Sequence, residues 1–154
     1  MKRFGMALLL LWIGTLLFSA SGCARPISCS SLLLTFADAY GIEGAVYTTE
    51  SRPWDEGYLS EEMLGRLYGE EVPAYRSAAV LLCSDFDTVR ECGVAVCESR
   101  EDVLRSAVVF DERIRLLCAY DLGAEGEVLT FGRTVVYFAL PDGARARDIW
   151  RRLL

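Results

Sequence analysis

The apolar residues of this chain follow two periodicities, one helical and one typical of strands, which alternate along residues 31–154. Apolar positions three and four residues apart, which share one face of a helix, mark the ranges 31–40, 60–68, 99–122 and 144–154. Alternating or continuous apolar runs between polar or glycine-containing turns mark strands at 45–49, 76–84, 91–98, 127–131 and 134–140. The predicted order of elements is therefore α-β-α-β-β-α-β-β-α.

This order predicts the fold class α+β. Two pairs of consecutive strands have short connections, and a helix lies between the pairs, which favours an antiparallel sheet. Ser60 and Ser99 are suited to begin helices, because a serine hydroxyl accepts a hydrogen bond from a free N–H of the first turn. Gly132 and Arg133 fit a two-residue type II′ hairpin turn. We expect a sheet of four to five strands with the helices packed on one face.

The two central strands are predicted to form a hairpin. If Ser84 lies opposite Glu91, then Cys83 lies opposite Cys92, and the alternation of a strand puts both thiols on one face. Opposed residues of an antiparallel pair are near enough for a disulfide, so this spacing permits a Cys83–Cys92 bond. In the alternative interpretation, these cysteines are small buried apolar residues.

The first 22 residues have the features of an export signal. Two basic residues precede a largely apolar run of 13 residues, which is short for a membrane-spanning helix of about 20. Small residues then lead to a cysteine, as in the lipobox of bacterial lipoproteins, at Ala20, Ser21, Gly22 and Cys23. The sequence thus predicts a signal peptide at 1–22, a tether at 23–30 and a single domain at 31–154, with Cys23 as the lipid attachment site.

The predicted location is the extracytoplasmic face of the cell membrane. Two acyl chains on Cys23 give stable anchoring, where a single chain gives only marginal binding. Two other interpretations stay open. Ordinary signal-peptide cleavage near Ala24 yields a soluble secreted protein. Alternatively, an uncleaved leader is itself the anchor, since no charged residue occurs from Phe4 through Ala24.

Charge and composition exclude several function classes. Lys2 and Arg3 contribute +2 to the net charge of −6, so residues 23–154 carry −8. An acidic domain without a basic stripe is poorly suited to nucleic acid, and we expect no such partner. The chain has no histidine, which excludes Ser-His-Asp and Cys-His catalysis within it and the usual histidine-containing zinc sites. We expect no catalytic residue, no metal and no cofactor.

The remaining reactive side chains have ordinary explanations. The chain has six cysteines but no CxxC pair, so thioredoxin-like chemistry and zinc ribbons have no support. Asp85, Asp87 and Glu91 fall together near the predicted central hairpin loop, but the glycine and spacing of a calcium loop are missing, and we interpret the loop as a solvated turn. Arg113 and Arg115 are expected to form surface ion pairs with acidic neighbours on the long helix.

Four stretches of the domain carry a family resemblance: Ser60–Gly69, Glu91–Cys97, Glu112–Ile114 and Val135–Phe138. Together they look like the lipoproteins of Gram-positive anaerobes grouped under domain of unknown function 4358. The resemblance covers about Ser31 to Leu154 and rests mostly on packing positions. The chain departs from the family pattern at Cys92 and Cys97. Because the family has no established activity, the resemblance implies a location and a fold, but no mechanism.

The sequence therefore predicts a non-enzymatic binding module, held at the membrane by its N-terminal lipid, with an envelope protein or a wall component as its partner. Two alternatives remain: a lipoprotein that binds a small molecule or an ion, and an enzyme that uses carboxylates or a thiol. The aromatic residues of the loop-rich middle are interpreted as core filling rather than as a binding patch: Trp54, Tyr58, Tyr68 and Tyr75.

Replacing Cys23 by alanine tests the predicted anchor. We expect the Cys23→Ala protein to lose both the acyl mass and the cleavage after Gly22, because the thiol is the group that is acylated. Intact mass spectrometry of membrane and soluble fractions measures both. A Cys23→Ala protein that is still processed and still membrane-bound would rule out the lipid anchor.

Overall fold

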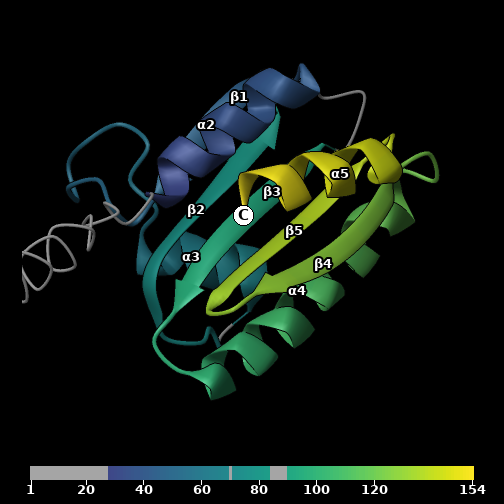
Figure 1. Cartoon of the computed structure of the whole chain (residues 1–154). Coiled ribbons are helices and arrows are strands. Elements are labelled where there is room, and N and C mark those ends of the chain that lie inside the picture. The colour runs from purple at the N-terminus through teal and green to yellow at the C-terminus, as the bar shows by residue number, and fades with distance from the viewer. Residues whose placement is uncertain (1–27, 70, 84–89) are drawn as a thin grey trace, which may run out of the picture.

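The computed structural model describes residues 28–69, 71–83 and 90–154. Outside the described residues lie the predicted signal peptide and its lipobox, with Ala20, Ser21, Gly22 and Cys23. The described chain forms four helices and a five-stranded antiparallel sheet (Figure 1). The α+β class and the order of elements predicted from the sequence are confirmed.

The elements have the following bounds. The helices are α2 (Cys29–Tyr40), α3 (Glu61–Tyr68), α4 (Arg100–Tyr120) and α5 (Gly143–Leu153). The strands are β1 (Gly44–Thr48), β2 (Tyr75–Cys83), β3 (Glu91–Cys97), β4 (Glu125–Phe131) and β5 (Thr134–Leu140). They are arranged in the order β1-β2-β3-β5-β4, and every neighbouring pair is antiparallel.

Local signals set most of the element ends. The Ser60 hydroxyl accepts from the Met63 N–H at the start of α3, as predicted. Ser99 caps α4, and Asp102 completes a reciprocal capping box. Gly132 has a φ of 62°, and no non-glycine residue of the described chain has a positive φ. A positive φ at the first turn position alone is the type II′ pattern expected for this hairpin.

Helix α2 begins two residues earlier than predicted. Ser28 is its N-cap, and the Glu50 carboxylate accepts from the Cys29 N–H at 2.8 Å and from the Ser30 hydroxyl at 2.9 Å. Glu50 follows β1 and is distant in sequence, so a tertiary contact extends the helix. Cys29 and Ser30, which the prediction placed in the tether, therefore belong to α2.

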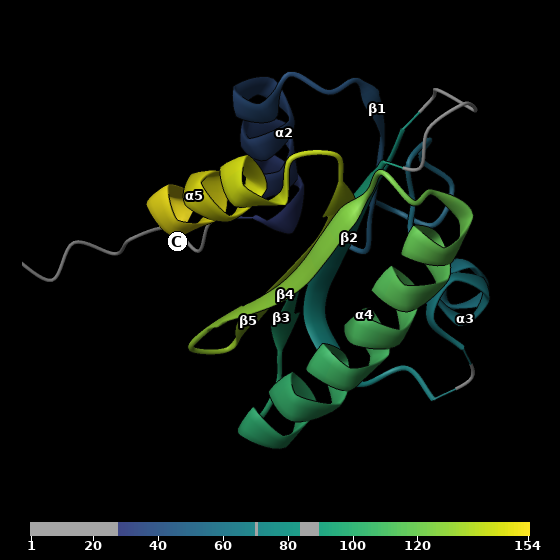
Figure 2. The same ribbon diagram turned by 90° about the vertical axis from the view of Figure 1, so that its right-hand side faces the viewer.

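Helices cover both faces of the sheet, which corrects the prediction of helices on one face (Figure 2). Helices α2 and α5 pack on one face, and α3 and α4 pack on the other. The central strands β2, β3 and β5 therefore supply apolar side chains in both directions. On β3, for example, Cys92 and Val94 join the core under α2, while Ala95 and Cys97 join the core under α4. Continuous apolar runs are typical of strands buried on two sides.

The register of the β2–β3 hairpin also differs from the prediction. Cys92 lies opposite Leu81 rather than opposite Cys83, and Cys83 instead donates its N–H to the Arg90 carbonyl at 3.1 Å. Both cysteines are free thiols, so the Cys83–Cys92 bond that the other register would permit is not formed. The shift is two residues, which keeps each side chain on its expected face. The sequence between β2 and β3 has no two-residue turn motif that would fix the register, so side-chain packing determines it.

Gly93 makes room for the ring of Tyr137, its partner on β5. A Cβ on Gly93 would lie 2.3 Å from Cε1 of that fully buried ring. We expect Gly93→Ala to lower the free energy of unfolding by about 1–3 kcal/mol, because the ring cannot move without repacking the core. Urea denaturation measures this change.

Gly65, inside α3, is the matched control. A Cβ there meets no atom within 4 Å. Gly65→Ala should therefore stabilise the protein by about 0.5–1 kcal/mol, the usual gain on replacing a helical glycine. Equal effects of the two substitutions would contradict the packing described here.

Candidate functional site

A buried acidic side chain lies beneath α4. Glu91, at the start of β3, is only 4% exposed. Its Oε1 accepts from Nε of Arg113 at 2.9 Å, and its Oε2 accepts from Nη2 of the same guanidinium at 2.6 Å. The Tyr137 hydroxyl of β5 donates to Oε1 at 2.5 Å. Arg113 thus binds the Glu91 carboxylate in bidentate geometry and Tyr137 binds it as well, and these bonds join α4 to the neighbouring strands β3 and β5.

The cluster continues to α3 through Tyr68. The hydroxyls of Tyr68 and Tyr137 are 2.9 Å apart. Because the single proton of Tyr137 is donated to Glu91, the Tyr137 oxygen accepts and the Tyr68 hydroxyl donates. We call these four side chains the buried network: Tyr68, Glu91, Arg113 and Tyr137.

Burial and the Glu91 charge set the protonation of the network. Burial, and then the Glu91 carboxylate, raise the pKa of the Tyr68 and Tyr137 hydroxyls well above the ordinary value, so both stay protonated donors. Burial alone lowers the pKa of the Arg113 guanidinium. The hydrogen bonds and charge of Glu91 outweigh that effect and raise the pKa overall, so Arg113 stays charged.

Aromatic rings enclose the network. The Phe110 ring of α4 lies 4.6 Å from the Tyr137 ring and 5.2 Å from the Tyr68 ring, centroid to centroid, and it also stacks on Tyr75 at 6.4 Å. Tyr68 and Tyr75 therefore pack against the core, which agrees with their interpretation as core-filling residues. Trp54 does not, since it is 77% exposed.

The structure corrects the predicted role of Arg113. Its partner is Glu91 on the sheet, not a neighbour on α4. Arg115 behaves as predicted and pairs with Asp111 across one helical turn at 2.6 Å. The sequence signal for the buried pair was a single glutamate at the head of an otherwise apolar strand. Asp85 and Asp87, named with Glu91 as one acidic group, lie outside the described residues.

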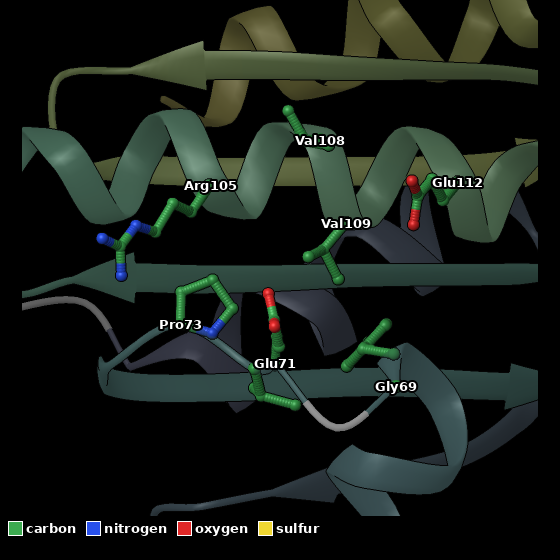
Figure 3. A pocket seen from close by; sticks show the side chains of 9 residues that line it. Gly69, Glu71, Pro73, Arg105, Val108, Val109 and Glu112 are labelled. Carbon is green, nitrogen blue, oxygen red and sulfur yellow. The ribbon is translucent and has the colours of Figure 1, made fainter.

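A groove of about 770 Å³ opens above the network, between α4 and the segment that joins α3 to β2 (Figure 3). One wall comes from the end of α3 and this segment: Tyr68, Gly69, Glu71, Val72 and Pro73. The other wall comes from α4: Arg105, Val108, Val109 and Glu112. The buried network therefore links the two walls of the groove, because Tyr68 lies in the first wall and Arg113 is next to Glu112 of the second wall.

Two carboxylates of the groove, Glu71 and Glu112, have no ion-pair partner within the part of the chain that the structure describes. Figure 3 shows Glu71 directed toward α4, across from Val109. Neither Glu71 nor Glu112 forms an ion pair with another described residue. Arg105, in contrast, is paired with Glu101 on its own helix at 2.6 Å. The groove thus offers negative charge above apolar contacts from Val72, Pro73 and Val109.

The groove opens onto an apolar strip on the outer side of α4. A shallower depression of about 490 Å³ shares Val108 and Glu112 with the groove and adds Leu104 and Ala107. Leu104 is 67% exposed and Val108 is 61% exposed. An open site that continues into exposed apolar side chains suits an extended or helical segment of a macromolecule better than an enclosed small ligand.

The three buried cysteines, Cys29, Cys92 and Cys97, are poor nucleophiles. Burial raises the pKa of the Cys29 thiol to about 11, and it also raises the pKa of the Cys92 and Cys97 thiols. A thiol that stays protonated near neutral pH reacts slowly. Within residues 28–69, 71–83 and 90–154, no group of three or more Cys, Asp or Glu side chains is placed to hold a metal ion.

Comparisons of the chain with protein-family models, with curated proteins and with solved structures gave no match. The family resemblance therefore stays a prediction, and function has to be inferred from the geometry of the groove. Among the described helices, none has the length and apolar composition that a membrane crossing requires.

Replacing Arg113 by methionine tests the buried pair. We expect Arg113→Met to lower the free energy of unfolding by about 3–5 kcal/mol, because Glu91 is left buried without its cation. Arg115→Met is the control on the same helix. It removes an exposed pair and should change stability by less than about 1 kcal/mol. Similar losses in urea denaturation for the two variants would show that the Glu91 pair is not buried as described.

Proposed function

We propose that this chain is an extracytoplasmic lipoprotein, tethered through Cys23, that acts as a non-enzymatic binding module. Its ligand is a segment of an envelope protein that carries both basic and apolar side chains, and the groove between α4 and the α3–β2 segment receives it. The observation that supports this proposal is that Glu71 and Glu112 line the groove beside apolar side chains and form no ion pair with any other described residue.

Charge complementarity favours a basic partner. The two arginines at the edge of the groove and strip, Arg105 and Arg115, are already engaged by Glu101 and Asp111. The charges left for an incoming segment are therefore the two glutamates. Residues 23–154 carry −8 overall, which also steers cationic partners toward the domain.

A binding role fits the buried network better than a catalytic one. The Glu91 carboxylate is 4% exposed and accepts three hydrogen bonds from Arg113 and Tyr137, so its charge is already bound within the fold. Its contribution is to fix the spacing of α3 and α4. A binding surface whose walls are already positioned loses less entropy when its partner docks.

Selection from a random peptide library, with the mature lipid-bearing protein as the target, tests the proposed specificity. We expect the selected peptides to combine Arg or Lys with Leu, Ile or Phe. The double variant E71Q/E112Q should weaken their binding by about ten-fold, because each rim charge contributes a modest share of the affinity. Fluorescence anisotropy measures the dissociation constants.

The matched control is E43Q/E98Q, which removes two exposed glutamates outside the groove. It should leave peptide binding unchanged. If both double variants weaken peptide binding equally, the effect comes from the net charge of the domain, and this result would contradict a binding site in the groove. If instead a metal or metabolite stabilises the protein by several degrees and E71Q/E112Q abolishes that shift, the groove is the site of a small ligand.

A further inference from the structure

Helix α5 is basic although the domain is acidic. It carries Arg145, Arg147, Arg151 and Arg152 but only one acidic residue, Asp148. Glu127 holds Arg147 at 2.6 Å, and Arg145 lies over the Tyr40 ring. The last two arginines are exposed and form no ion pair with another described residue. The C-terminal turn of α5 thus has two positive charges available to a ligand.

This basic turn lies on the side of the molecule from which α2 begins. The contacts between the two helices run antiparallel: Tyr40 accepts from the Asp142 N–H at 3.0 Å, and the rings of Phe36 and Trp150 stack at 4.5 Å. The C-terminal end of α5 therefore lies nearer to the N-terminal end of α2 than to the C-terminal end of α2 (Figure 1). Leu34 of α2 and Leu154 are both exposed, at 58% and 41%.

The start of α2 is also the part of the domain closest to the predicted anchor. Five peptide units separate Cys23 from the N-cap Ser28. A fully extended chain of that length spans at most about 18 Å. A lipid on Cys23 therefore keeps the beginning of α2 within that distance of the membrane surface.

We propose that the layer formed by α2 and α5 docks on the membrane, with Arg151 and Arg152 bound to the headgroups of anionic phospholipids. This inference rests on the proposed lipid anchor. Each arginine near an anionic surface favours contact by about five-fold, so the pair together favours this orientation by about 25-fold. Leu34 and Leu154 add apolar contacts at the same surface.

The orientation has a direct consequence for the groove. The sheet separates the α2–α5 layer from the α3–α4 layer, as Figure 2 shows. When α5 faces the lipid, α4 and the groove face away from it. The excess negative charge on the rest of the domain is repelled by the same headgroups and favours the same orientation. The bilayer thus presents the groove to partners in the envelope.

Paramagnetic line broadening measures the orientation. The full lipid-bearing protein is placed in phosphatidylglycerol nanodiscs that contain a lipid with a nitroxide headgroup, and amide signals are compared between layers. We expect stronger broadening at 31–34 and 151–154 than along α4. In phosphatidylcholine nanodiscs the broadening at 151–154 should fall toward that along α4, while 31–34 stays broadened because the lipid on Cys23 holds the start of α2 near the membrane. The variant R151E/R152E should reduce the preference by about 25-fold or more.

The control R66E/R100E makes the same charge change on the α3–α4 side, outside the groove, and should leave the broadening pattern unchanged. Broadening at 151–154 that is no stronger than along α4 in phosphatidylglycerol, with the lipid on Cys23 confirmed by intact mass, overturns the docking inference and leaves the anchor intact. Absence of a lipid from Cys23 overturns the anchor, and the docking inference with it.

Discussion

The buried ion pair between Glu91 and Arg113 is the constraint on which the α3–α4 side of this structure, with its groove, depends. A carboxylate at 4% exposure is tolerated only when its charge and lone pairs are satisfied, and here a guanidinium and a tyrosine hydroxyl satisfy them. Each partner comes from a different element. The requirement to satisfy one charge therefore fixes α4 against β3 and β5, and Tyr68 extends the constraint to α3.

The groove follows from that constraint. Its walls are the end of α3 with the segment after it, and one side of α4, and the network bonds to both. Glu71 and Glu112 face the opening without an ion-pair partner in the described chain, whereas the arginines nearby are paired on α4 itself. The buried charge of Glu91 is thus compensated inside the domain, whereas Glu71 and Glu112 keep their charge available to a partner at the groove. On the other face of the sheet, Arg151 and Arg152 are exposed, so their charges are also available to a ligand.

The sequence predicts local features well and long-range ones poorly. The caps Ser60 and Ser99 and the Gly132 turn were predictable because each depends on residues within a few positions. The two covered faces, the β2–β3 register and the partner of Arg113 were not, because each depends on which distant segments pack together. The groove was missed for the same reason: its two carboxylates come together only after α4 packs beside the α3–β2 segment. The continuous apolar runs in the central strands were the one available sign of burial on both faces.

A double-mutant cycle between Tyr137→Phe and Arg113→Met tests the central claim most directly. Both side chains bind the same Glu91 oxygen, so their contributions to the free energy of unfolding should be coupled. Urea denaturation of the wild type, both single variants and the double variant gives the coupling energy. We expect the loss in the double variant to differ from the sum of the two single losses by about 1 kcal/mol or more. Additivity to within about 0.5 kcal/mol would show that the two side chains act independently and that no common network holds the groove.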